Sequence, residues 1–269
     1  MTRTGVVLSG GGIRGFAHLG LLRVMRECGI KPHAISGVSA GAIVGAFYAA
    51  GLEPQQIMDI LKKNSYFGWS AFSLLKDGFF SMKSLLNTLK MYIPHDSFGQ
   101  LNIPLFVTAT DFTNNSPVVF SSGNLSEAVI ASASVPVIFE PVRIGNSLFV
   151  DGGLLNNFPV EPLEDSCDRL VGCHVNSIET NAAAEKPIGK INIIEKCFHL
   201  AIASIIYEKA KKCDLFIEPH LYGYGMFDMQ KSDIIYETGY RAALKYKDKL
   251  LELAVENAAH SNDRIKQNN

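Results

Sequence analysis

A charge-free stretch from Ala34 to Leu52 constrains the fold of this chain more than any other feature. Its length would suit a membrane-spanning helix. Its first half, however, contains Gly37-Val38-Ser39-Ala40-Gly41, and glycines and a serine gathered in this way are typical of a tight turn. We therefore expect a buried strand that ends at Ser36, a sharp turn, and a buried helix over residues 42–50, with no membrane span.

Strand and helix patterns alternate along the chain. Strands are expected at residues 5–9, 33–36, 104–110, 117–121, 169–176 and 214–218, with a hairpin at residues 141–150. Helices are expected at residues 16–27, 54–63, 82–92, 125–133, 191–213 and 231–257. Such alternation is typical of an α/β domain around a mostly parallel sheet, and 269 residues suit one such domain.

The composition excludes several classes of function. The formal net charge is −1, so no overall positive field attracts nucleic acid. The 5 cysteines are scattered and include no CxxC pair, which disfavours a zinc site or a disulfide framework and favours a reducing compartment. The first residues lack the long apolar stretch of a signal peptide, so we expect a cytoplasmic protein.

The turn around Ser39 has the pattern GxSxG. On a sharp turn from a strand to a helix, a serine projects its hydroxyl from the edge of the sheet, and Gly37 and Gly41 relieve the crowding of the turn. The amide end of the following helix stabilises negative charge there. Ser39 is therefore the candidate nucleophile, and the alternative is an ordinary glycine-rich turn.

A second glycine-rich segment, Gly10-Gly11-Gly12-Ile13-Arg14-Gly15, lies between the first strand and the first helix. It matches the GxGxxG pattern of dinucleotide-binding folds, but residues 31–36 offer no carboxylate for a ribose, and no Gly-Lys-Ser/Thr follows as in a P-loop. Its backbone amides would form an anion nest, which in an acyl-transfer enzyme holds the oxyanion. Arg14 would add positive charge there, or else be a solvated surface residue.

A serine nucleophile needs a base. Asp151 ends an apolar strand and is followed by Gly152 and Gly153. A carboxylate at the end of a strand, next to small residues, is in a position typical of a functional-site residue. Burial would raise its pKa towards that of a useful base, whereas a turn-forming Asp-Gly is the alternative. Histidine is the usual base in such sites. His220, just after a strand, is a better candidate than His174, which is expected inside a strand.

Three motifs stand together in the chain: GGGIRG at Gly10 to Gly15, GVSAG at Gly37 to Gly41, and DGG at Asp151 to Gly153. In this order and at these distances they resemble the patatin-like phospholipases. The serine- and alanine-rich stretch from Ala131 to Pro136 is also similar to one in that family. The resemblance covers residues 5–162 and implies a three-layer α/β/α sandwich with a mostly parallel central sheet.

The resemblance also implies a Ser–Asp dyad, in which Ser39 attacks an ester carbonyl and Asp151 accepts its proton. Backbone amides of Gly11 and Gly12 would form the oxyanion hole, with Ala40 as a further donor and Arg14 beside them. Family members cleave acyl esters of phospholipids and other lipids, so the resemblance implies a lipid substrate, no metal and no cofactor. An acyltransferase with the same dyad, an anion- or nucleotide-binding module and a catalytically silent scaffold are the alternatives.

The rest of the chain carries fewer signals. Residues 163–258 are expected to complete the same domain, and residues 259–269 to form a frayed tail. The stretch from Ser65 to Phe80 holds the only Trp and several Phe residues without a clean period. It is expected to line the acyl pocket, to contact a membrane surface transiently, or to belong to the core. A membrane contact would make the protein peripheral at a membrane.

Overall fold

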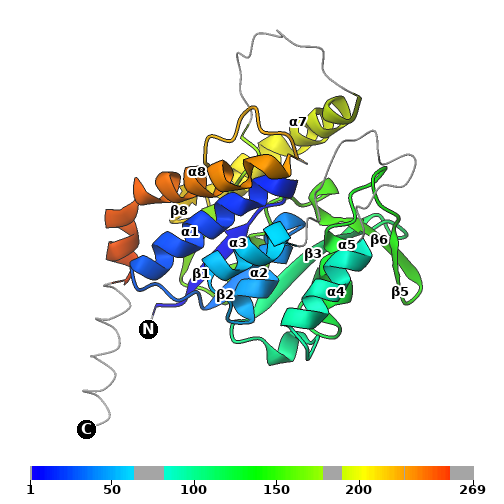
Figure 1. Ribbon diagram of the computed structural model, residues 1–269, viewed down its shortest axis with the longest axis horizontal. Coiled ribbons are helices and arrows are strands. Elements are labelled where there is room, and N and C mark those ends of the chain that lie inside the picture. Colours follow the sequence, from blue (N-terminus) through cyan, green and yellow to red (C-terminus); the bar gives the residue numbers. More distant parts are fainter. Residues whose placement is uncertain (1, 64–81, 178–189, 227, 255–269) are drawn as a thin grey trace.

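The computed structural model describes residues 2–63, 82–177, 190–226 and 228–254. Within these ranges the chain forms a mixed, mostly parallel sheet of eight strands with helices on both faces (Figure 1), so the predicted α/β/α arrangement is confirmed. The strands are β1 (Thr4–Leu8), β2 (Ala34–Val38), β3 (Leu105–Asp111), β4 (Ser116–Phe120), β5 (Val142–Ile144), β6 (Ser147–Asp151), β7 (Arg169–Cys173) and β8 (Leu215–Ile217).

The helices confirm most of the predicted segments. The α-helices are α1 (Phe16–Glu27), α2 (Ala40–Ala49), α3 (Pro54–Lys63), α4 (Met82–Tyr92), α5 (Leu125–Ser132), α6 (Glu161–Glu164), α7 (Lys190–Ala210) and α8 (Ser232–Leu244). Short 3-10 turns are η1 (Gly12–Gly15), η3 (Phe98–Gln100), η4 (Gly152–Leu154) and η5 (Met229–Lys231). Helices α1, α3 and α4 have the predicted ends, because each carries a clear apolar period.

The sheet has a parallel centre and an antiparallel end. Its strand order is β5-β6-β3-β2-β1-β7-β8, and β4 also pairs with β3. Strands β3, β2, β1, β7 and β8 run parallel to their neighbours in this order. Strands β4, β6 and β5 are joined through antiparallel pairs. Strands β7 and β8 thus extend the same sheet, while the domain limit at residues 162 and 163 stays a prediction.

Alternate side chains of β1 contact two different helical layers. Val6 and Leu8 belong to a large core cluster that α1, α2 and α8 share, whereas Val7 belongs to a smaller cluster with Ile202 and Ile206 of α7. A strand places successive side chains on opposite faces of its sheet, so this alternation shows that β1 is covered on both sides. Figure 1 shows α1 and α8 alongside each other over one face.

Several predicted boundaries are wrong, among them the end of β2 at Val38 instead of Ser36 and the end of α7 at Ala210 instead of residue 213. The strand expected at residues 169–176 ends at Cys173. Its neighbour β8 ends at Ile217, and the N–H of Val175 donates to a side chain instead, so His174 follows β7 rather than lying inside it. Helix α8 ends at Leu244, where residues 245–246 form a turn before helical structure resumes at 247–254. Helix α2 begins two residues early, at Ala40, because the turn before it is tight.

The charge-free stretch forms β2, a turn and α2, as predicted, and nearly all of its residues from 34 to 49 are buried. Within the described ranges, no helix combines the length and the apolar character that crossing a membrane requires. Residues 65–80, expected to contact lipid or line a pocket, and residues 259–269, expected to be a frayed tail, lie outside the described residues. Cytoplasmic residence stays a prediction.

Candidate active site

Strands β2 and β6 meet end to end along one edge of β3. Thr108 of β3 pairs with Val38 of β2 and also with β4. The next residue, Ala109, pairs with Asp151 of β6 and also with β4. Strands β2 and β6 therefore share the edge opposite β4, and because β6 is antiparallel to β3, their carboxyl ends point towards each other. The turn at Ser39 and the turn after Asp151 thus lie side by side.

Ser39 occupies the strained turn that its motif predicts. Its φ is 52° and its ψ is −121°, a conformation that L-residues rarely adopt and that costs about 1–3 kcal/mol. The turn closes because its glycines lack side chains. A Cβ on Gly37 would lie 2.6 Å from the carbonyl oxygen of Gly41, and a Cβ on Gly41 would strike the carbonyl oxygen of Leu8. The fold therefore places the Ser39 side chain at the N-terminus of α2.

Asp151 combines burial with one unpaired oxygen. Its Oδ1 accepts a hydrogen bond from the Gly153 N–H at 2.7 Å. Its Oδ2 is buried and has no partner in the part of the chain that the structure describes. Burial raises the pKa of the Asp151 carboxyl to about 6, against the lowering effects of the Ser39 hydroxyl and the Gly153 N–H. A carboxylate with this pKa is a suitable base at neutral pH.

The Ser39 hydroxyl lies close enough to Asp151 to lower the pKa of its carboxyl, yet no hydrogen bond of normal geometry joins the two side chains. Catalytic hydrogen bonds are often long before substrate binds, so the unpaired Oδ2 is compatible with a role as base. The candidate nucleophile and the candidate base are therefore neighbours.

The serine- and alanine-rich stretch at the end of α5 holds the main chains of Ser39 and Asp151 through hydrogen bonds. Ser132 Oγ accepts the Ser39 N–H at 2.8 Å and donates to the carbonyl oxygen of Thr108 at 2.6 Å. The carbonyl oxygen of Ser134 accepts the Asp151 N–H at 2.8 Å. Both serines are fully buried, so water does not compete for these bonds. This stretch thereby fixes the backbone of the candidate nucleophile and of the candidate base.

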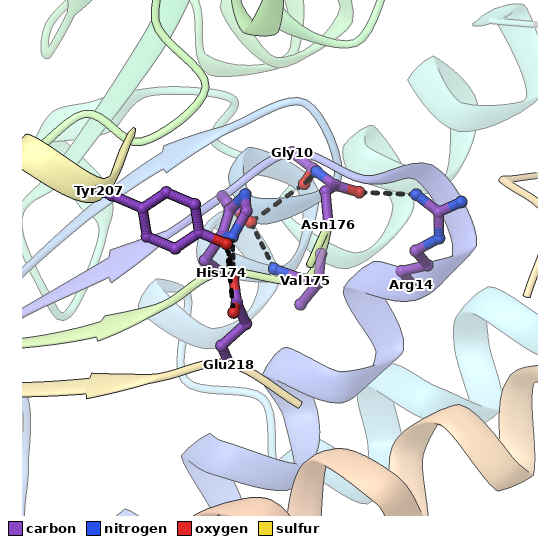
Figure 2. A network of polar contacts seen from close by, with 8 residues as sticks. Gly10, Arg14, His174, Val175, Asn176, Tyr207 and Glu218 are labelled. Carbon is purple, nitrogen blue, oxygen red and sulfur yellow. Dashed lines mark hydrogen bonds and ion pairs between the residues drawn. The ribbon is translucent and has the colours of Figure 1, made fainter. Parts of the chain in front are cut away.

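The glycine loop between β1 and α1 lies against Ser39, because a Cβ on Gly10 would be 3.1 Å from the Cβ of Ser39. The Gly10 N–H donates to Asn157 Oδ1 at 3.1 Å. The Gly10 carbonyl accepts a hydrogen bond from Asn176 Nδ2 at 2.6 Å, and Figure 2 shows this contact. Two asparagines from distant parts of the chain therefore hold the start of the loop.

The three main-chain donors predicted for the oxyanion hole are unpaired. The N–H groups of Gly11 and Gly12 have no acceptor among the residues described. Ala40 is the first residue of α2, so its N–H has no acceptor within the helix. Free N–H groups of this kind, at the start of η1 and of α2, favour a negatively charged oxygen.

Arg14 is tied to its neighbours and is not the solvated surface residue considered above. Its Nε donates to the carbonyl oxygen of Tyr224 at 2.9 Å. Its Nη1 donates to Asn176 Oδ1, also at 2.9 Å, and Figure 2 shows this second contact. Its main-chain N–H donates to the carbonyl oxygen of Gly11 at 3.2 Å. Of the residues predicted for the oxyanion hole, Arg14 is thus the one whose main-chain N–H is already paired.

No histidine is hydrogen bonded to Ser39 or Asp151 within the described residues. His220 is exposed, beyond the end of β8. His174 is buried, and its Nδ1 lies 2.7 Å from Glu218 Oε1. Figure 2 shows this pair with Tyr207, near the contacts that Gly10, Asn176 and Arg14 make. The geometry therefore favours Asp151 over either histidine as the base.

Three buried residues that hold the site were not predicted from the sequence, namely Ser132, Asn157 and Asn176. Ser132 was noted only as part of a stretch similar to the family. Asn157 precedes an apolar run and Asn176 follows a buried strand, so both are polar residues in apolar surroundings. Buried polar side chains require partners, and this is the signal that could have drawn attention to them.

The side chains around the site suit an anion better than a cation. Across the described ranges, no three His, Cys, Asp or Glu side chains are grouped as metal ligands would be. Among the residues that the structure describes, Asp151 is the one carboxylate at the junction of β2 and β6, and the other contributors are N–H groups. Such an arrangement suits a developing negative charge.

Comparison with known proteins extends these observations. A family model described as patatin-like phospholipase matches residues 6–164. An uncharacterized NTE family protein of Mycobacterium tuberculosis is 29% identical over 195 residues, which cover 68% of this chain and 52% of that protein. The lysophospholipase nte1 of Aspergillus fumigatus is 27% identical over 282 residues, which cover 91% of this chain and 18% of that protein. The chain thus spans about half the length of the first relative and much less of the second.

Among solved structures, VipD from Legionella pneumophila matches with a TM-score of 0.54 at 15% sequence identity. The match covers 92% of this chain and 67% of VipD. At this identity the likeness concerns the fold alone. The match to VipD covers more of this chain than the family model does, so it includes part of the chain after residue 164.

Proposed function

The chain belongs to the patatin-like phospholipase family, and we propose that it is a serine lipid acyl hydrolase. In this proposal Ser39 is the nucleophile, Asp151 is the base, and the substrate is a carboxylic ester of a phospholipid or a related lipid. The observation that supports it most is the junction of β2 and β6. There a serine in a strained turn lies beside a buried carboxylate with an unpaired oxygen.

The first half of the reaction forms an acyl-enzyme. Ser39 Oγ attacks the carbonyl carbon of the ester, and its proton passes to Asp151 Oδ2. The carbonyl oxygen becomes an oxyanion that the N–H groups of Gly11, Gly12 and Ala40 stabilise, each donor being worth about 10²–10³ in rate. When the tetrahedral intermediate collapses, the bond to the leaving alcohol breaks, and that oxygen takes the proton back from Asp151.

The second half releases the fatty acid. A water molecule gives its proton to Asp151 and attacks the carbonyl carbon of the acyl-enzyme, with the oxyanion in the same set of N–H groups. The intermediate collapses by breaking the bond to Ser39 Oγ, which takes the proton from Asp151. Serine and carboxylate return to their starting states, and one residue serves as base and acid in turn.

Hydrolysis of p-nitrophenyl esters from short to long chain tests the proposal. Wild type should cleave them and Ser39→Ala should not, while Asp151→Asn should lose about 10²–10⁴ in kcat. Circular dichroism and melting temperatures confirm that both variants fold. Wild-type rates in Ser39→Ala would refute the nucleophile. An added alcohol that captures most of the acyl group would favour the acyltransferase alternative, and a folded wild type without activity on esters or lipid micelles would favour the silent scaffold.

A further inference from the structure

Both polar groups of Gly10 are held by buried asparagine side chains. Its N–H donates to Asn157 Oδ1 at 3.1 Å, and its carbonyl oxygen accepts from Asn176 Nδ2 at 2.6 Å. The same carbonyl oxygen accepts a second hydrogen bond, from Ser9 Oγ at 3.0 Å. Asn157 is 6% exposed and Asn176 is 3% exposed, so water does not compete for these bonds.

The hydrogen bond from Asn176, together with the longer one from Ser9, sets where the Gly11 N–H points. In a trans peptide, the C=O of one residue and the N–H of the next point in opposite directions. The Gly10 C=O is directed at Asn176, so the Gly11 N–H is directed away from it. Because glycines flank this peptide on both sides, neither residue has a Cβ of its own that restricts its rotation. A bond from outside the loop is needed to hold one orientation.

Arg14 determines which end of the Asn176 amide meets Gly10. An asparagine can present either its oxygen or its NH₂ group, but a guanidinium only donates. Asn176 Oδ1 accepts from Arg14 Nη1 at 2.9 Å, which leaves Nδ2 for the Gly10 carbonyl. Arg14 is itself anchored by its bond to the Tyr224 carbonyl. Figure 2 shows how the Asn176 side chain lies between the loop and Arg14.

We propose that Asn176 is a positioning residue of the oxyanion hole. By holding the Gly10 carbonyl, it aims the Gly11 N–H at the oxygen of the ester bound beside Ser39. This inference rests on the proposed function. Asn176 touches no reacting atom, so its effect is expected where charge develops in the transition state, and less in the binding of the ester itself.

Steady-state hydrolysis of one p-nitrophenyl ester by wild type, Asn176→Ala and Asn176→Asp tests the inference. Both variants should lose about 10²–10³ in kcat, while KM changes by less than about threefold. Asn176→Asp keeps the size of the side chain and an acceptor for Arg14, but it places a carboxylate oxygen against the Gly10 carbonyl. If Asn176→Ala does not fold, the kcat of Asn176→Asp tests the positioning role by itself.

Asn156→Ala is the matched control. Asn156 is also buried, at 9% exposure, and its side chain makes bonds to Lys209 and Glu161 but none to the glycine loop. Its kcat should stay within about threefold of wild type, even if its melting temperature falls. A second comparison uses Arg14→Gln. The double variant Arg14→Gln/Asn176→Ala should lose no more kcat than Asn176→Ala, because both residues act through one amide group.

Three outcomes would overturn the inference, and they are distinguishable. Near wild-type kcat in Asn176→Asp, with Ser39→Ala inactive, would refute the positioning role and leave the proposed function intact. An equal loss of kcat in Asn156→Ala would show that removing a buried asparagine near the site lowers kcat whether or not it contacts the glycine loop. Wild-type activity in Ser39→Ala would refute the proposed function, and the role of Asn176 with it.

Discussion

The turn at Ser39 and the glycine loop at Gly10 contribute to one site but are held in different ways. The turn is fixed mainly by backbone packed on backbone, since Gly41 lies against the main chain of β1, and one side chain, that of Ser132, accepts the Ser39 N–H. The loop is fixed by side chains, those of Asn157 and Asn176. We infer that Ser39 cannot be displaced without disturbing the fold, whereas the oxyanion donors of the glycine loop can be. The predictions below test this difference.

Gly41→Ala should have the largest effect. The added Cβ would strike the carbonyl oxygen of Leu8 and lie 2.6 Å from its carbonyl carbon. These are backbone atoms of a central strand and cannot move aside, so we expect a loss of more than about 3 kcal/mol in the free energy of unfolding. Urea unfolding against Gly99→Ala, where a Cβ meets nothing closer than 3.9 Å, measures it. Equal stability of the two variants would show that the turn can rearrange to accommodate the added Cβ.

Gly11→Ala should instead reduce the rate of a folded enzyme. The φ of Gly11 is 156°, and its added Cβ would lie 2.5 Å from Val175 Cγ2 and 2.8 Å from Asn176 Oδ1. The side chains of Val175 and Asn176 can shift where main-chain atoms cannot, so the loop should move. The N–H of residue 11 would then no longer point at the oxyanion. We expect kcat to fall about 10²–10³. A loss of folding as severe as that of Gly41→Ala would contradict the distinction between the turn and the loop.

The same difference explains what the sequence could predict. The turn at Ser39 depends on residues within a few positions of it, so its pattern was enough to place a strand, a turn and a helix. The loop depends on asparagines 147 and 166 positions away, which no local pattern connects to it. The meeting of β2 and β6 is equally non-local. It follows from the pairing of β3 with three other strands, and Asp151 reaches Ser39 only through that pairing.

Asp151→Asn tests the same junction through stability. Burial raises the pKa of Asp151 from 3.8 to about 6, so the folded state binds a proton more tightly than the unfolded state does. The contribution of this carboxyl to the free energy of unfolding is therefore greatest below pH 4. It falls by about 3 kcal/mol as the pH rises through 6. Asparagine does not titrate, so Asp151→Asn should lack this fall and be more stable than wild type at pH 8.

Urea unfolding of wild type and Asp151→Asn at pH 4 and pH 8 measures this effect. The same carboxyl must be ionised to act as the base, so wild-type kcat/KM should fall below about pH 6 with unit slope. A parallel pH dependence of unfolding in both proteins would show that Asp151 is solvated like an ordinary carboxylate. The junction of β2 and β6 would then lack a buried base, and the proposed role of Asp151 would fail.

His220→Ala should have the smallest effect. His220 is exposed, and no described residue connects it to the turn or to the loop. Its replacement should change kcat by less than about twofold and the free energy of unfolding by less than about 0.5 kcal/mol. A loss of kcat as large as that of Asp151→Asn would instead make the base a histidine. The chemistry would then need a residue from beyond β8, and the junction of β2 and β6 would position the nucleophile without supplying its base.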